Sequence, residues 1–148
     1  MTAVFPYLLP LLPVAAMMCS DIRTRRIDVR WLAAFAVGTM TIGVEKYGFR
    51  EAAIYSAANI CIFGAMLLML GIFYGFRRLF RYGFGAGDAL FFVAVAPTCD
   101  MRPYVIYLIA TFACGAVWGL VSHRRSVPLV GVAGFTFTIH IALMLWMR

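Results

Sequence analysis

Residues Ala52–Phe76 read AAIYSAANICIFGAMLLMLGIFYGF, a run of 25 positions without a charged side chain. A helix needs about 20 apolar residues to cross the hydrocarbon core of a bilayer. The rest of the chain has the same character, because 64% of its 148 residues are hydrophobic and 13% are charged. A soluble domain is about a quarter charged. We therefore expect one all-α membrane domain over residues 1–148.

Five further apolar runs flank this one. They are Val4–Ser20, Trp31–Val44, Asp88–Thr98, Pro103–Val121 and Leu129–Met147. The run that starts at Asp88 is too short to cross a bilayer alone. The sequence thus predicts six transmembrane helices, of which the fourth is short. A secretory signal peptide carries Lys or Arg before its apolar core. No Lys or Arg precedes the first run, so we expect this run to be a retained span.

The basic residues predict the orientation of these helices. Lys and Arg number nine in the first, third and fifth loops together and three in the second and fourth, which span Glu45–Glu51 and the region around Arg102. Cytoplasmic loops carry the excess of positive charge, so the odd loops should be cytoplasmic and both termini outside. A bacterial inner membrane fits this pattern. The basic residues behind the net charge of +7 thus serve to orient the helices and lie near membrane lipids. We therefore expect no nucleic-acid partner.

Three aspartates lie where ionisable groups are costly and therefore candidates for function. Asp21 ends the first span, Asp28 starts the second and Asp88 opens the fourth. The predicted topology places all three at the cytoplasmic face. Asp88 follows Gly85, Ala86 and Gly87, and glycines allow unusual backbone and close approach of another segment. The simpler interpretation is a loop followed by Asp88 as a helix N-cap.

Two carboxylates that share a site can divide proton transfer between them. One takes a proton from water and the other donates a proton to a carbonyl oxygen, as in aspartic proteases. This chemistry requires no metal or cofactor, and we expect none. The four cysteines form no CxxC pair and the two histidines lack a carboxylate cluster, which argues against a metal site. We expect His140 and Asn59 to form hydrogen bonds between helices.

The motif Asp21-Ile22-Arg23-Thr24-Arg25-Arg26-Ile27 before a span resembles the first aspartate motif of the type IV prepilin peptidases. Gly85-Ala86-Gly87-Asp88 resembles their GxGD motif, and Ser126-Val127-Pro128-Leu129 resembles their short proline motif. The resemblance implies a membrane aspartic protease with Asp21 and Asp88 as the catalytic pair and Gly85 and Gly87 as motif support. It implies a prepilin-like substrate with a basic leader, cleaved at the cytoplasmic side. The chain resembles the short branch without the methyltransferase insert.

Two positions depart from the family pattern. Asp28 follows Ile27 where the family usually has proline, and Leu90 stands where it usually has lysine. Asp28 could contact the leader or cap the second helix. Two alternatives stay open at this point. One is a non-catalytic scaffold of a pilus or secretion system, and the other is a small proton-linked transporter that uses Asp21, Asp88 and His140.

Overall fold

The computed structural model describes residues 5–24, 27–78, 85–122 and 127–146. Parts of the sequence motifs lie outside these ranges. They are Arg25 and Arg26 of the first motif, Gly83 and Phe84 before the GxGD motif, Arg81, Arg124 and Arg125 of the basic loops, and Ser126 of the proline motif. The two candidate catalytic aspartates and the two motif glycines are all described.

Helices make up nearly all of the described chain, which contains no strand. Their order is α1 (Phe5–Leu8), α2 (Leu11–Thr24), α3 (Val29–Tyr47), α4 (Phe49–Tyr74), α5 (Phe76–Arg78), α6 (Ala86–Val95), the 3-10 helix η2 (Ala96–Thr98), α7 (Met101–Ser122) and α8 (Leu129–Trp146). The expected all-α fold is confirmed. The fourth apolar run is also short, because α6 has 10 residues and η2 has 3.

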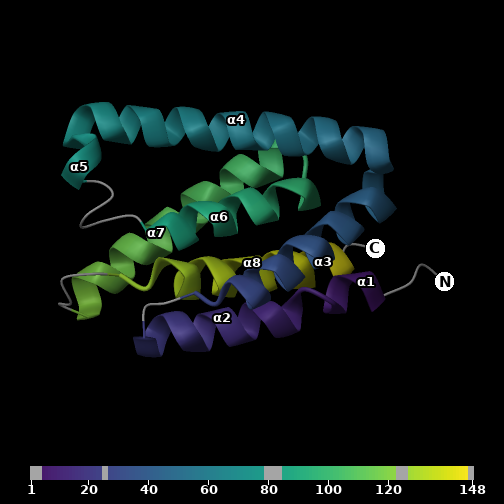
Figure 1. Cartoon of the computed structure of the whole chain (residues 1–148), viewed down its shortest axis with the longest axis horizontal. Helices are drawn as coiled ribbons and strands as arrows, with labels where there is room; N and C mark the ends of the chain where they lie inside the picture. Colours follow the sequence, from purple (N-terminus) through teal and green to yellow (C-terminus); the bar gives the residue numbers. More distant parts are fainter. Residues whose placement is uncertain (1–4, 25–26, 79–84, 123–126, 147–148) are drawn as a thin grey trace.

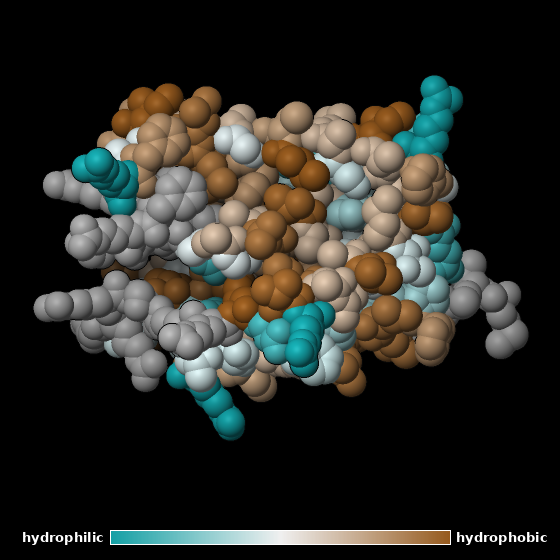
Figure 2. Space-filling view, viewed as in Figure 1, coloured by the Kyte–Doolittle hydropathy of each residue, from teal (hydrophilic) through white to brown (hydrophobic). Residues whose placement is uncertain are grey.

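Four helical segments in the described ranges are long and apolar enough to cross a membrane. They are Phe5–Thr24, Phe49–Tyr74, Met101–Ser122 and Leu129–Trp146. Helix α3 has 19 residues and carries Arg30 near its start and Glu45 and Lys46 near its end. Figure 2 shows apolar residues over the middle of the molecule, with most hydrophilic side chains toward its two ends. This distribution is that of a multi-pass membrane protein.

The helices run alternately between two ends of the molecule (Figure 1). One end gathers the end of α2, the start of α3, α5, the start of α6, the end of α7 and the start of α8. We call it the motif end, because the aspartate and proline motifs fall on these helix ends. The start of α1, the end of α8 and the α3–α4 junction lie at the opposite end. The helix ends that flank the odd loops therefore share one end, as the predicted topology requires.

Two boundaries differ from the expectation. The first span was expected over Val4–Ser20, punctuated by Pro6, Pro10 and Pro13. In the structure, α1 ends at Leu8 and α2 begins at Leu11. Pro10 explains the break, because a proline disfavours helical backbone at the residue before it. The second loop was expected over Glu45–Glu51, but helix continues on both sides of Gly48, whose φ is 80°. A glycine takes this conformation at no steric cost, so one residue makes the whole turn.

Helix α6 lies at the centre of the packing. Phe91 and Phe92 are fully buried. The Phe91 ring stacks on Phe35 of α3 with centroids 4.8 Å apart, and Phe35 meets Phe137 of α8 edge to face at 5.1 Å. Each such aromatic pair stabilises by about 0.5–1.5 kcal/mol beyond the area it buries. These contacts fix α6, and with it the start of the helix that carries Asp88.

The far end of the short fourth helix is closed off inside the protein. All residues from Ala96 to Cys99 are buried, and Asn59 of α4 donates to the carbonyls of Ala96 and Cys99 at 2.9 and 2.7 Å. Asn59 thus forms the expected hydrogen bonds between helices.

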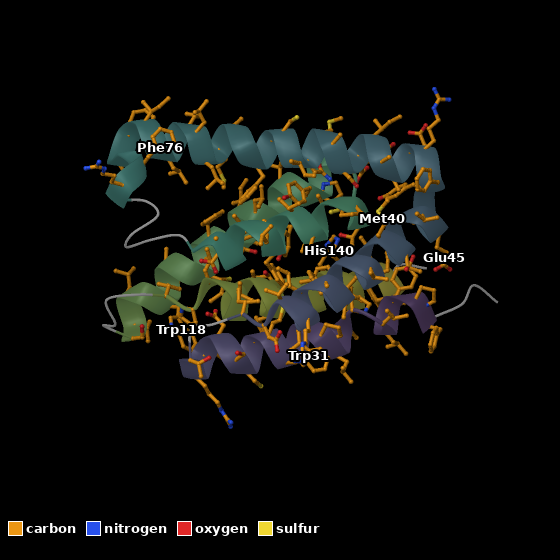
Figure 3. The ribbon with its side chains drawn as sticks, in the orientation of Figure 1. Trp31, Met40, Glu45, Phe76, Trp118 and His140 are labelled. Carbon is orange, nitrogen blue, oxygen red and sulfur yellow. The ribbon has the colours of Figure 1, made fainter. Side chains whose placement is uncertain are left out.

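His140 does not behave as expected. It lies inside the bundle (Figure 3), and its Nε2 atom has no hydrogen-bond partner in the described part of the chain. The ring of Tyr107 lies close to the imidazole, with centroids 6.3 Å apart. The Tyr107 hydroxyl instead donates to the Ala133 carbonyl at 2.9 Å, so it is not available to the histidine as a donor.

Candidate active site

Asp21 lies in the last turn of α2 and is 6% exposed. Its Oδ2 atom accepts a hydrogen bond from the Gly131 N–H at 2.9 Å. Gly131 belongs to the first turn of α8, where backbone N–H groups have no partner within the helix. A carboxylate at this position also lies at the positive end of the helix dipole. Asp21 therefore joins α2 to α8 across 110 residues of chain.

Asp88 lies in the first turn of α6 and is partly buried. Its Oδ2 atom accepts a hydrogen bond from the Gly85 N–H at 2.8 Å. Gly85 is the N-cap residue of α6 and Asp88 is the third residue of the helix. The N-cap interpretation of Asp88 is therefore wrong by three positions, although its side chain does satisfy the amide at the cap. This local hydrogen bond fixes the carboxylate at the N-terminus of α6.

Gly87 explains how the two motifs come near each other. A Cβ atom added at Gly87 would lie 2.6 Å from Cδ1 of Ile27, closer than real side chains approach. Ile27 is partly buried and packs against the core. Ile27, just before α3, therefore lies directly against the residue before Asp88. The missing side chain at Gly87 is what this contact requires.

Gly85 is confined for a different reason. A Cβ atom at this position would lie 3.2 Å from Oδ2 of Asp88, tighter than an ordinary carbon–oxygen contact. A larger residue would crowd the carboxylate itself. The two glycines of the motif thus leave room for different neighbours, Ile27 in one case and Asp88 in the other.

Asp28 has a structural role at the start of α3. It is the N-cap residue of that helix, and its Oδ1 atom accepts a hydrogen bond from the Arg30 N–H at 2.9 Å. A side-chain oxygen at this position commonly satisfies one of the unpaired first-turn amides. Asp28 is exposed, and the carboxylate is committed to α3 rather than to α6 or α8.

The structure thus brings the end of α2 and the start of α6 to the motif end, each with a carboxylate held by a backbone amide (Figure 1). Two neighbours were missed by the sequence analysis. Gly131 carries no chemical signal, because its contribution is a backbone N–H. Ile27 was noted only as part of a motif. The signal for its contact was the glycine at position 87, because a residue without a side chain allows another segment to approach closely.

Acid–base chemistry is what this arrangement can supply. The described residues contain no group of three or more His, Cys, Asp or Glu side chains placed to hold a metal ion. Asp88 lies beside the exposed residues Gly85 and Ala86, so water can approach it from the motif end. The structure defines a multi-pass α-helical membrane protein with two amide-held carboxylates at one end.

Comparison with known families agrees with this class. The family model described as Type IV leader peptidase family matches residues 8–120, which is most of the chain. The chain belongs to the type IV leader peptidase family. The matched region contains Asp21, Gly85, Gly87 and Asp88, whereas α8 lies beyond it. No curated protein matches the chain, and no solved structure does so.

Proposed function

We propose that this protein is a membrane aspartic endopeptidase that removes the basic leader from type IV prepilin-like proteins at the cytoplasmic face. Membership of a leader peptidase family supports a protease. The observation that carries the finer proposal is the placement of Asp21 and Asp88 at one end of the bundle, each bonded to a helix-start amide. The pair would act in the bacterial inner membrane.

The proposed reaction needs only the two carboxylates and water. The ionised member takes a proton from a water molecule, whose oxygen attacks the scissile carbonyl carbon. The protonated member donates its proton to the carbonyl oxygen, which gives a neutral tetrahedral intermediate. Collapse of the intermediate breaks the C–N bond, and a proton passes to the leaving amine. General acid and base groups typically contribute about 10²–10⁴-fold each.

The length of the fourth helix supports cleavage near the membrane surface. Helix α6 and η2 together span about 21 Å at ordinary helical rise, whereas the hydrocarbon core is about 30 Å thick. A helix this short cannot reach from one surface to the other. Asp88 at its start would lie slightly below the headgroups, near the junction between a charged leader and an apolar substrate helix.

The departure at Leu90 does not count against this activity. Leu90 lies two positions after Asp88 in α6 and is 53% exposed. Residues two apart on a helix do not face each other, so Leu90 is not a neighbour of the carboxylate. The departure therefore leaves the hydrogen bond between Gly85 and Asp88 untouched. The departure therefore does not decide between the peptidase and the non-catalytic scaffold, and the cleavage test does.

The test is cleavage by the purified full-length chain in vesicles that contain prepilins from the same genome. Mass spectrometry would locate the cut at the leader–helix junction. Asp21→Asn and Asp88→Asn should each reduce cleavage by about 10²–10⁴-fold and leave the protein folded. The double variant should be scarcely worse than either single variant, because groups that act as a unit do not add.

Asp28→Asn is the matched control. It should retain most activity, because Asn caps a helix about as well as Asp. Loss of cleavage in Asp28→Asn with retention in Asp21→Asn would mean that the wrong carboxylates have been paired. Cleavage by all three single variants would rule out the aspartic mechanism. Stable association of the wild-type chain with prepilins without cleavage would favour the scaffold.

A further inference from the structure

The C-terminal helix α8 makes a contact with the candidate site that the family match does not reach. The match ends at residue 120, and α8 begins at Leu129. Even so, the hydrogen bond that the structure gives Asp21 comes from Gly131 of α8. This buried bond ties a catalytic candidate to a helix outside the matched region.

We propose that the first turn of α8 positions Asp21 for the reaction through the backbone N–H of Gly131, and that Gly134 makes this contact reachable. The inference rests on the proposed function, in which Asp21 is one of the two catalytic carboxylates. Gly131 and Gly134 act through Asp21, and they are therefore positioning residues rather than catalytic ones.

The close approach of α2 and α8 depends on Gly134. A Cβ atom at this position would lie 2.6 Å from Cγ of Met18 and 3.0 Å from Cγ1 of Val14, both on α2. Gly134 lies three residues after Gly131, so both glycines lie on one face of α8. At Gly131 an added Cβ would reach Cγ1 of Ile22 at 3.4 Å. Small residues of this kind let membrane helices pack backbone to backbone.

The hydrogen bond fixes the direction of the Asp21 side chain. Pro128 precedes α8 and has no polar side chain that could cap it. The Gly131 amide would therefore stay unpaired in a buried place without Asp21, at a cost of about 1–3 kcal/mol. The two groups hold each other, and one of the staggered side-chain orientations of Asp21 is selected. A catalytic group held in this way keeps its geometry through the reaction.

The test separates α2 from α8 at Gly134 and then restores their packing. Gly134→Ala in the purified full-length chain should lower kcat for prepilin cleavage by about 10–100-fold, as a displacement of about 1 Å can do. KM should change less than about twofold, since the proposal assigns no substrate contact to Gly134. Gly134→Ala with Met18→Ala removes the opposing side chain, and kcat should recover most of the loss.

Gly64→Ala is the matched control. Gly64 lies on α4, and an added Cβ would meet nothing within 4 Å. This variant introduces the same methyl group into a membrane helix and should leave kcat unchanged. A loss of kcat in Gly64→Ala equal to that in Gly134→Ala would overturn the proposal, because the effect would then be one of general stability.

A spectroscopic measurement tests the contact without substrate. With 15N-glycine labelling in micelles, the Gly131 amide signal should shift in Asp21→Asn and in Gly134→Ala and return toward its position in the Met18→Ala double variant. An unchanged Gly131 signal in Asp21→Asn would overturn the contact itself. A shifted signal in Gly134→Ala with full kcat would overturn its role in positioning. Full cleavage by Asp21→Asn would instead refute the proposed function, and the amide signal would still report on the contact.

Discussion

Asp21 and Asp88 are held in similar ways by very different parts of the chain. Each accepts one backbone N–H at the start of a helix, at 2.9 and 2.8 Å. The donor to Asp88 lies three residues away in the same helix turn, whereas the donor to Asp21 lies 110 residues away. Asp88 is partly buried and Asp21 is 6% exposed. The position of Asp88 is thus encoded locally, and that of Asp21 depends on the assembled bundle.

The comparison would fail outright if the two carboxylates lay at opposite membrane faces. Single cysteines in place of Arg23, Arg77, Arg50 and Arg102, in a background without the native cysteines, test this. An impermeant maleimide added from outside should label positions 50 and 102 and leave 23 and 77 unlabelled, because basic loops stay cytoplasmic. Outside labelling at position 23 would refute the predicted orientation.

The contact between Ile27 and Gly87 joins the two regions, and its disruption should have the next largest effect. Gly87→Ala places a methyl group 2.6 Å from Cδ1 of Ile27, so the Ile27 side chain must move away from α6. We expect kcat for prepilin cleavage to fall by about 10–100-fold. Gly87→Ala combined with Ile27→Ala should recover part of that loss. Equal activity of both variants and the wild type would show that the spacing at this contact is unimportant.

Truncation of each carboxylate to alanine should separate local from tertiary support. Asp21→Ala leaves the buried Gly131 amide without an acceptor and should lower the free energy of unfolding by about 1–3 kcal/mol. Asp88→Ala removes a bond at an exposed helix start and should cost about 1 kcal/mol or less. Reversible unfolding in mixed micelles, followed by circular dichroism, measures both. A larger loss in Asp88→Ala would reverse the comparison.

Asp28 provides the smallest expected effect. Its carboxylate caps α3 at an exposed position. Asp28→Ala should lower the free energy of unfolding by about 0.5–1 kcal/mol, and Asp28→Asn by a few tenths at most. Cleavage should stay within about twofold of wild type in both variants. A tenfold loss of cleavage in Asp28→Asn would instead point to contact with the substrate leader.

The sequence predicted features that depend on composition and local order. Apolar runs and the clustering of arginine were enough for an all-α membrane fold with a short fourth helix, and the GxGD motif marked the start of α6. The end of α1 at Leu8 and the single-residue turn at Gly48 were not predicted, although prolines punctuate the first run and charged residues mark the loop at Glu45–Glu51. Helix boundaries depend on backbone geometry at single residues.

The partners of the site residues were less accessible to sequence reasoning. A backbone N–H such as that of Gly131 cannot be recognised from the residue type. Its hydrogen bond to Asp21 forms only when α2 packs on α8. The lack of a partner for Nε2 of His140 among the described residues was also unpredictable, because the hydroxyl of its neighbour Tyr107 donates to a carbonyl of α8 instead. Contacts of this kind follow from the packing angles of whole helices.

The two hydrogen bonds of Asn59 have a consequence for the synthesis and membrane insertion of the protein. Asn59 lies within the longest apolar helix, and its partners are carbonyls 37 and 40 residues further along the chain. Synthesis proceeds from the N-terminus, so α4 enters the bilayer before Ala96 and Cys99 have been made. The Asn59 amide therefore lacks these two acceptors when α4 is inserted. A polar group in lipid is costly, so hydrogen bonding to the segment that later provides the acceptors is favourable. Asn59 thus favours an order of assembly in which α4 is inserted first and the end of the fourth helix then packs against it.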